Sequence, residues 1–182
     1  MRIRVKHLKY IVSISIAILF SLVISGIVLA WNYDEEGFVF ENGVDPLYYQ
    51  FYSGTSQDTK DAFTMGAYYW ETASDSPVNY EYTTGIYVDV YCYEVYAPNW
   101  PSVSGHCMHE NDQSLCYLNT YVTASWYAGK RISTAGHELG HAIGHGENDN
   151  MLMDHDDDWR WDVLGIEEPT YFDIYYTNQL YD

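Results

Sequence analysis

The sequence has few basic side chains: 8 of its 182 residues are Lys or Arg, against 26 Asp or Glu. Four of the eight (Arg2, Arg4, Lys6 and Lys9) lie at the start. Removing residues 1–30 takes away these four and no acidic residue, which leaves 152 residues with a formal charge of −22. Nucleic acids and anionic lipids attract basic surfaces, so this charge excludes ordinary binding to either. With 47% apolar residues, the remaining length indicates one folded domain with a single core.

Charged residues of either sign are missing from Tyr10 to Ala30. An apolar run of this length behind a basic start is typical of an export signal. Val28 and Ala30 suit the two positions that a signal peptidase inspects, so Trp31 is the expected first residue of the mature protein. The run is also long enough to span a bilayer. Residues 1–30 are therefore predicted to be a signal peptide or an uncleaved membrane anchor, and the domain faces the outside of the cell in both cases.

Cysteine is scarce, with only Cys92, Cys107 and Cys116 in the chain. Exported domains meet an oxidising environment, in which cysteines pair. The three cysteines predict one disulfide and one remaining thiol, and the sequence does not determine which two of them pair.

Hydrophobic periodicity divides the rest of the chain into strands and helices. Alternating or aromatic runs between Gly and Pro residues predict strands at 47–52, 78–82, 86–93 and 115–122. Apolar residues at helical spacing predict helices at 56–73, 132–144 and 170–181. The segment 97–114 is rich in Pro, Gly and Asn and is expected to be a loop. Strands and helices without regular alternation indicate an α+β domain at 47–182, a twisted mixed sheet packed on helices, behind an acidic lead-in at 31–46.

Two local patterns refine these elements. The alternation in 86–93 places four side chains on one face that is expected to be buried: Ile86, Val88, Val90 and Cys92. Thr55 with Asp58, and Thr170 with Asp173, have the spacing of capping boxes at the starts of the first and the last helix.

Three of the six histidines after the leader lie in one short segment, His137-Glu-Leu-Gly-His141-Ala-Ile-Gly-His145. His137 and His141 are four residues apart, so on a helix both rings share a face within reach of one ion. Glu138 follows the first histidine, which places its carboxylate beside the attacking water, where a general base must lie. A catalytic zinc site needs three protein ligands and one open position. The segment therefore predicts a zinc hydrolase whose third ligand comes from the turn that follows.

The segment from His137 to Gly144 resembles the start of the extended zinc motif of metzincin peptidases, H-E-x-x-H-x-x-G-x-x-H, and is most similar to the matrixin branch with its small secreted bacterial relatives. Other segments resemble, in the same order, the first helix, the strand before the active-site helix, the methionine turn at Leu152-Met153 and the closing helix. The resemblance spans about residues 47–181. It implies a zincin-like catalytic domain with an active-site helix, a C-terminal helix and a catalytic Zn²⁺, with Met153 as a floor beneath the imidazoles and not as a ligand.

The motif leaves two candidates for the third zinc ligand. The family pattern has a histidine at the eleventh position, where this chain has Glu147, and His145 lies two residues earlier. Gly144 suits the left-handed turn that ends a helix, and in the family the third residue beyond it reaches the metal. This favours Glu147, which completes a His₂Glu set. The turn before Met153 is short, however, and a short turn brings His145 to the metal instead.

Two further segments carry side chains of the kinds that bind metals. His106, Cys107 and His109 lie in a region where matrixin domains often hold a structural zinc. The ligand spacing differs here, and a loop with a disulfide is the simpler interpretation of these residues. The acidic run at 154–158, close to Glu147 and Asp149, offers oxygen ligands of the kind that Ca²⁺ prefers. A run of carboxylates is also typical of a solvated turn. Ca²⁺ is therefore a candidate second ion.

These features predict a secreted zinc-dependent endopeptidase that acts as a monomer on protein or peptide substrates. Glu138 serves as the general base, and the substrate lies along the expected edge strand 115–122. Nucleic acid is not an expected partner, and no membrane contact is expected beyond an N-terminal anchor. Two alternatives stay open. One is a non-catalytic zinc-binding or cell-wall-associated module of the same fold. The other is a zinc hydrolase whose third ligand is a downstream Glu, for which the candidates are Glu167 and Glu168.

Overall fold

The computed structural model describes residues 38–182. The predicted leader, its cleavage site after Ala30 and the lead-in up to residue 37 lie outside the described residues. Within residues 38–182, no helix combines the length and the apolar character that are needed to cross a bilayer.

Five strands form one mixed sheet with the order β2-β1-β3-β5-β4. The strands are β1 (Leu47–Phe51), β2 (Tyr80–Tyr82), β3 (Val90–Val95), β4 (Gly105–Glu110) and β5 (Gln113–Asn119). β1 pairs in parallel with β2 and β3, and β3 pairs in parallel with β5. β4 pairs antiparallel with β5 and has no strand on its other side within the described part of the chain, so it is an edge strand.

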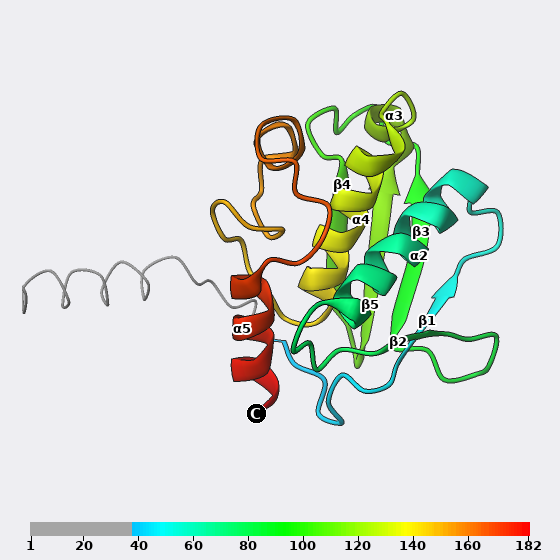
Figure 1. Cartoon of the computed structure of the whole chain (residues 1–182). Coiled ribbons are helices and arrows are strands. Elements are labelled where there is room, and N and C mark those ends of the chain that lie inside the picture. The colour runs from blue at the N-terminus through cyan, green and yellow to red at the C-terminus, as the bar shows by residue number, and fades with distance from the viewer. Residues whose placement is uncertain (1–37) are drawn as a thin grey trace, which may run out of the picture. The chain divides into compact units, whose positions relative to one another are not determined.

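Helices complete the fold that the sequence predicted. They are α2 (Gln57–Thr72), α3 (Thr120–Thr123), α4 (Ala128–Ala142), the π-helix η1 (Asp158–Val163) and α5 (Tyr171–Tyr181). α2 and α4 lie side by side across the same face of the sheet (Figure 1). α5 packs near the C-terminal end of α4, where Thr177 contacts His145. The expected α+β architecture, with a mixed sheet, a helix that carries His137 and His141, and a C-terminal helix, is confirmed.

α2 and α4 approach each other closely at Gly66 and Gly136. A Cβ atom on Gly66 would lie 2.9 Å from the Gly136 backbone nitrogen, so a larger residue would push the helices apart. At the same crossing, the Trp70 indole N–H donates to the Gly136 carbonyl oxygen at 2.8 Å. Trp70 and Phe63 from α2 and Leu139 from α4 are completely buried between the helices and the sheet. The core thereby holds α4 in one position on the sheet.

The edge of the sheet differs from the prediction. The segment 97–114, expected to be a loop, contains β4, and the strand expected at 115–122 is β5, which lies between β3 and β4. β5 also ends at Asn119, whose side chain caps α3. β4 has the sequence Gly-His-Cys-Met-His-Glu, with no β-branched residue. Its strand structure therefore comes from pairing with β5 and from the disulfide across the two strands, which local propensity does not report.

The strand predicted at 86–93 also has different ends, because β3 begins at Val90. Val88, Val90 and Cys92 are buried as expected, whereas Ile86 is 90% exposed. Pairing with both neighbouring strands begins at Val90. Ile86 lies before the paired region, where alternation no longer decides which side chain is buried.

The helix starts agree in part with the predicted capping boxes. The pair Thr170 and Asp173 forms a complete capping box at the start of α5, as predicted. At α2 the capping residue is Ser56 and not Thr55. The Thr55 hydroxyl instead donates to the Tyr52 carbonyl oxygen at 2.9 Å, which closes the turn after β1.

Part of the expected lead-in belongs to the packed unit. Phe40 and Val44 are buried in the core. The Phe38 ring stacks on His109 with the ring centroids 3.8 Å apart. Within the described residues, the folded unit therefore begins before residue 47.

The disulfide joins Cys107 in β4 to Cys116 in β5, which confirms the expected count of one disulfide and one thiol. The thiol belongs to Cys92, which is completely buried. Burial raises the pKa of this thiol well above its ordinary value, so the reactive thiolate form is suppressed.

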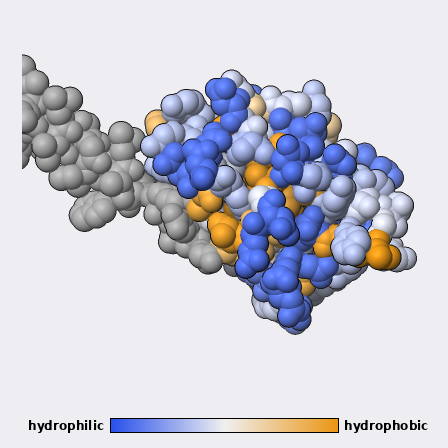
Figure 2. All heavy atoms as spheres, turned by 90° about the horizontal axis from the view of Figure 1, so that it is seen from below, coloured by the Kyte–Doolittle hydropathy of each residue, from blue (hydrophilic) through white to orange (hydrophobic). Residues whose placement is uncertain are grey.

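The surface reflects the acidic composition. Figure 2 shows one face on which hydrophilic residues predominate and hydrophobic residues form small, separate areas. Lys130, Arg131 and Arg160 are three of the four basic residues that follow residue 30, and each forms an ion pair with an aspartate. Most of the unpaired charge on the described part of the chain is therefore negative.

Candidate metal centre

α4 carries His137, Glu138 and His141 on the side that faces β4 and the turn after the helix. His137 and His141 are 5% and 7% exposed. Their Nε2 atoms are only 2.9 Å apart, and their rings meet edge to face. The spacing of four residues therefore brings both rings to one point, as the sequence predicted.

Backbone carbonyls orient both rings. The Nδ1 atom of His137 lies 3.0 Å from the Leu152 carbonyl oxygen, and that of His141 lies 2.7 Å from the His145 carbonyl oxygen. A carbonyl can only accept, so each Nδ1 carries the proton and donates it. Each Nε2 then presents a lone pair. Two lone pairs at this distance repel each other unless a cation lies between them, and this is how metal-binding histidines are held.

Gly144 ends the helix and reverses the chain. Its φ angle is +92°, and a Cβ atom there would lie 2.1 Å from the Phe38 carbonyl oxygen, so only glycine fits this turn. The Gly144 and His145 amides donate back to the carbonyls of the last helical turn at 2.9 and 3.1 Å. This is a left-handed helix end of the expected kind. It directs the next residues back toward the histidines.

Glu147 lies beside the histidine pair after this reversal. Its Oε1 atom is 3.5 Å from His141 Nε2 and 3.8 Å from His137 Nε2. The ligand atoms of the three residues lie within 4.8 Å of one another. Two ligands about 2.0–2.1 Å from a tetrahedral Zn²⁺ lie roughly 3.3–3.4 Å apart. The three side chains thus form a group that could hold a metal ion of this size.

His145, the other candidate ligand, lies in the core. Its side chain is completely buried, its Nε2 atom is 2.8 Å from the Thr177 hydroxyl of α5, and its ring is 5.4 Å from that of Trp70. Burial and the nearby His141 lower the pKa of His145 to about 3, so the ring stays neutral. The structure therefore brings Glu147, and not His145, to the two histidines of α4.

Glu138 is 4% exposed, and its Oε2 atom has no hydrogen-bond partner among the residues that the structure describes. Burial raises the pKa of Glu138 to about 8, against the lowering effect of His141 and Arg160. β4 passes directly over this carboxylate, since a Cβ atom on Gly105 would lie 2.4 Å from Glu138 Oε1. A buried carboxylate that is left unpaired by the protein is unfavourable. It is suited to a partner that the protein itself does not supply, such as a water or a substrate group.

Met153 packs against α4 between His137 and His141. The residue is completely buried, and a Cβ atom on Gly140 would lie 2.2 Å from its sulfur. Gly140 stands between His137 and His141 on α4, so the thioether packs directly against the segment that carries both rings. The preceding amide, Leu152 N–H, donates to the buried Asp173 carboxylate of α5 at 3.1 Å. The turn at Leu152-Met153 is thus held by α4, through Met153, and by α5, through Asp173.

Arg160 and Asp157 are parts of this region that were not predicted. Arg160 is 1% exposed and lies 3.1 Å from His137 Nδ1, while its guanidinium pairs with Asp157. Because that Nδ1 donates to the Leu152 carbonyl, Arg160 acts there as a neighbouring cation and not as a hydrogen-bond donor. Burial first, and then the Arg160 charge, lowers the pKa of His137, which keeps the ring neutral. A single basic residue inside an acidic run was the only signal in the sequence.

His106, Cys107 and His109, the candidate ligands of a second zinc, do not form a group of ligand atoms close enough to share an ion. His106 and His109 are three residues apart in β4, which places them on opposite faces of the sheet. His106 lies beside Tyr117, whereas His109 contacts Ser114 at 3.0 Å. The sulfur between them is bonded to Cys116.

Carboxylates of the acidic run at 154–158 form hydrogen bonds and ion pairs with other groups of the protein. Asp154 accepts hydrogen bonds from the Asn150 and Asp156 amides at 2.7 and 3.0 Å. Asp157 pairs with Arg160, and Asp158 pairs with Lys130. Within residues 38–182, His137, His141 and Glu147 are the one group of three or more ligand side chains close enough to share an ion. The run therefore forms no second cluster of this kind for the candidate Ca²⁺.

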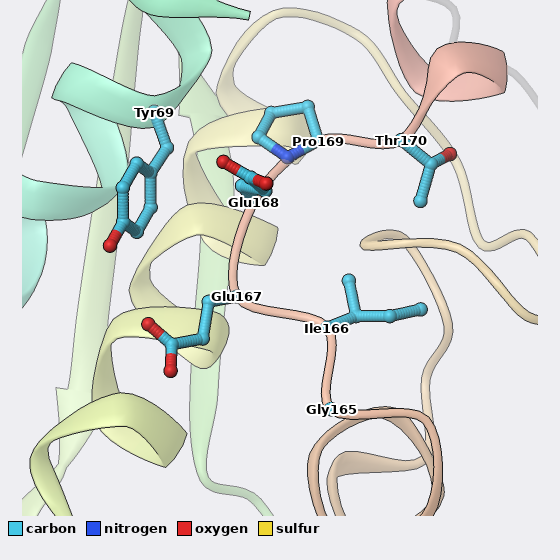
Figure 3. A pocket seen from close by; sticks show the side chains of 7 residues that line it. All are labelled: Tyr69, Gly165, Ile166, Glu167, Glu168, Pro169 and Thr170. Atoms are coloured by element: carbon cyan, nitrogen blue, oxygen red, sulfur yellow. The ribbon is translucent and has the colours of Figure 1, made fainter.

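Glu167 and Glu168, the downstream candidates for a third ligand, lie elsewhere. They line an open groove of about 430 Å³ between Tyr69 of α2 and the segment that leads into α5 (Figure 3). The Glu167 carboxylate is close to Gly129, two helical turns before His137. Neither residue belongs to the group at His137 and His141.

Searches of protein-family models and of curated protein sequences found no match for this chain. Its function is therefore inferred from the group at His137, His141 and Glu147 and from the residues around it. The structure shows an α+β fold and, on one of its helices and the turn that follows, a candidate site for one metal ion.

Proposed function

We propose that this protein is a secreted zinc-dependent endopeptidase. The observation that carries the proposal is the pair of Nε2 atoms 2.9 Å apart, both made lone-pair donors by carbonyls behind the rings. The Glu147 carboxylate beside them adds a third ligand of the type that zinc hydrolases use. The same three side chains leave one coordination position for the reaction.

The donor set fits zinc better than a hard cation. Two imidazoles and one carboxylate suit Zn²⁺, whereas Ca²⁺ takes six to eight oxygen ligands. When bound, Zn²⁺ acts as a Lewis acid that polarises the scissile carbonyl and makes water a stronger nucleophile at neutral pH. His137, His141 and Glu147 would hold it.

Glu138 is the residue that transfers the proton in the proposed reaction. Its carboxylate is next in sequence to the first ligand, is almost fully buried and has a vacant oxygen. It accepts a proton from the attacking water and then delivers that proton to the leaving amine. Burial raises the pKa of Glu138 toward the pH at which the enzyme works, where the same group can both accept and release a proton.

The free edge of β4 is the surface on which an extended peptide fits. Asn119 N–H donates to the Ser104 carbonyl oxygen at 2.7 Å, which makes these two residues a hydrogen-bonded pair of the antiparallel ladder. Pairs alternate along such a ladder, so the backbone groups of Gly105, Cys107 and His109 face away from β5. A peptide added there forms main-chain hydrogen bonds beside Glu138. This replaces the prediction that the substrate lies along 115–122.

Two features support a location outside the cell. The disulfide between β4 and β5 is typical of an oxidising compartment. The sequence of residues 1–30 has the pattern of an export signal or anchor.

Zinc analysis and casein cleavage, with and without a chelator, test the proposal. The expected result is one zinc ion per chain and cleavage that stops with the chelator and returns with zinc. Glu138→Gln should retain the zinc and the fold but lose activity by roughly 10²–10⁴-fold, because an amide cannot accept the proton. A wild-type protein that binds zinc and cleaves no unfolded protein would instead support the non-catalytic module.

A further inference from the structure

Arg160 is the most buried basic side chain that the structure describes, with 1% of its surface exposed. It lies in the π-helix η1, and π-helices are frequent at functional sites. The guanidinium donates to the Ser133 hydroxyl at 2.9 Å and to the Thr134 hydroxyl at 3.2 Å, both on α4. It also donates to the Asp154 carbonyl oxygen, one residue after Met153. One side chain thus joins η1, α4 and the turn beneath the metal centre.

Asp157 connects this cation to the edge strand. Its Oδ1 atom accepts hydrogen bonds from the Arg160 guanidinium and, at 2.9 Å, from the Thr134 hydroxyl. Its Oδ2 atom accepts one from the Ser104 hydroxyl. Ser104 is 8% exposed and immediately precedes β4. The Asp157 carboxylate is therefore hydrogen-bonded at once to the start of β4, to α4 and to η1.

These contacts lie directly beside the proposed general base. Thr134 is four residues before Glu138, so its side chain is on the same face of α4, one turn away. Gly105 follows Ser104, and a Cβ atom on Gly105 would lie 2.4 Å from Glu138 Oε1. The Asp157–Ser104 hydrogen bond therefore holds β4 at the place where the strand crosses the carboxylate.

Stability alone does not account for an ion pair at this place. Moving two charges from water into a protein interior is unfavourable, and well-packed apolar residues of similar volume often stabilise a fold equally well or better. Charged hydrogen bonds differ from apolar packing in that they define distances and directions. Here they define the separation between the free edge of β4 and the helix that carries the metal ligands.

We propose that Asp157 and Arg160 are positioning residues, which hold the start of β4 where a bound peptide meets Glu138. The inference rests on the proposed peptidase function. Neither residue touches the substrate, and neither is a metal ligand. A displacement of about 1 Å between reacting groups lowers rates on the order of 100-fold. Loosening the Asp157 contacts therefore lowers turnover while the zinc ligands stay in place.

Substitutions at Ser104 and Asp157 test this in the zinc-loaded mature chain. Ser104→Ala removes the hydroxyl from β4 and leaves the ion pair intact, and Asp157→Asn removes the charge. Both variants are expected to lower kcat roughly 10- to 100-fold and to raise KM, with one zinc still bound per chain. Ser104→Thr keeps a hydroxyl and should restore both constants. Asp162→Asn is the matched control, because Asp162 lies in η1, which Asp157 immediately precedes, but pairs with Lys130 at 2.8 Å.

Amide hydrogen exchange gives a readout that does not depend on activity. In Ser104→Ala, the amides of residues 105–110 should exchange at least about tenfold faster, while those of β1 and β3 keep their protection. A purely structural role would lower the thermal midpoint but leave KM and the kcat per active site unchanged.

Three outcomes decide the matter. Unchanged kcat and KM in both Ser104→Ala and Asp157→Asn overturn the inference, and so does unchanged exchange of β4. A wild-type protein that binds zinc and cleaves no peptide overturns the proposed function and, with it, the catalytic part of the inference. The exchange experiment then still decides whether Ser104 and Asp157 hold β4.

Discussion

Glu147 and His145 are two residues apart, and replacing each by Ala is expected to change different properties of the protein. The Glu147 side chain is 48% exposed, and its carboxylate faces both Nε2 atoms. Loss of a group that merely supports a metal ligand lowers affinity about 10- to 100-fold. Loss of the ligand itself in Glu147→Ala should therefore lower zinc affinity by at least about 100-fold. The metal-free protein should keep its stability within about 0.5 kcal/mol, as is usual for exposed sites.

His145→Ala should have the opposite effect. The His145 side chain is completely buried between Trp70 and Thr177, so its removal leaves a cavity and deletes a hydrogen bond. Substitutions of this kind cost about 2–5 kcal/mol. For a domain of this size, that lowers the thermal midpoint by about 5–20 °C. Zinc affinity should change little, because the backbone carbonyl that orients His141 is retained.

The assay measures both properties on each variant. Zinc affinity is measured by competition with a chromophoric chelator, at a temperature where all variants are folded. The thermal midpoint is measured on metal-free protein, since bound zinc stabilises the folded state by itself. His155→Ala is the control, because that histidine is 70% exposed and should affect neither property. Loss of zinc with His145→Ala, together with full affinity in Glu147→Ala, would refute the assignment of Glu147.

Three further predictions concern the strand edge and the metal. Gly105→Ala places a Cβ atom 2.4 Å from Glu138 Oε1 and should displace that carboxylate. We therefore expect kcat to fall at least about tenfold with unchanged zinc content. A variant with wild-type kcat would contradict this prediction. Replacing Cys107 and Cys116 together by Ser should lower the free energy of unfolding by about 2.5 kcal/mol, because the disulfide closes a loop between residues nine positions apart. Unfolding in urea measures this change. With free zinc at about 100 times its dissociation constant, the folded state should gain about 2.7 kcal/mol, so a chelator should lower the thermal midpoint. If the chelator does not change the thermal midpoint, the folded state binds no zinc.

Local patterns in the sequence were sufficient to predict the three long helices and two of the three side chains of the candidate metal group, but not α3 or η1. The helix at 56–73, the capping box at Thr170 and the spacing of His137 and His141 each depend on residues within a few turns of one another. For the same reason Gly144 identified the end of α4, since a left-handed helix end needs glycine whatever surrounds it. The number of disulfides followed from the cysteine count and the predicted oxidising compartment.

Tertiary contacts decided what depends on distant partners. β4 has weak strand propensity and exists because β5 pairs with it, so a loop was predicted where the sheet has its free edge. The sequence favours Glu147 as the third ligand but leaves His145 open. In the structure His145 packs in the core against Trp70 and Thr177, and Glu147 lies beside the histidines of α4. The two partners of His145 lie more than 30 positions away in the chain, and β4 depends on a separate strand. Periodicity within one segment carries no information about such partners, and only packing of the whole domain brings them together.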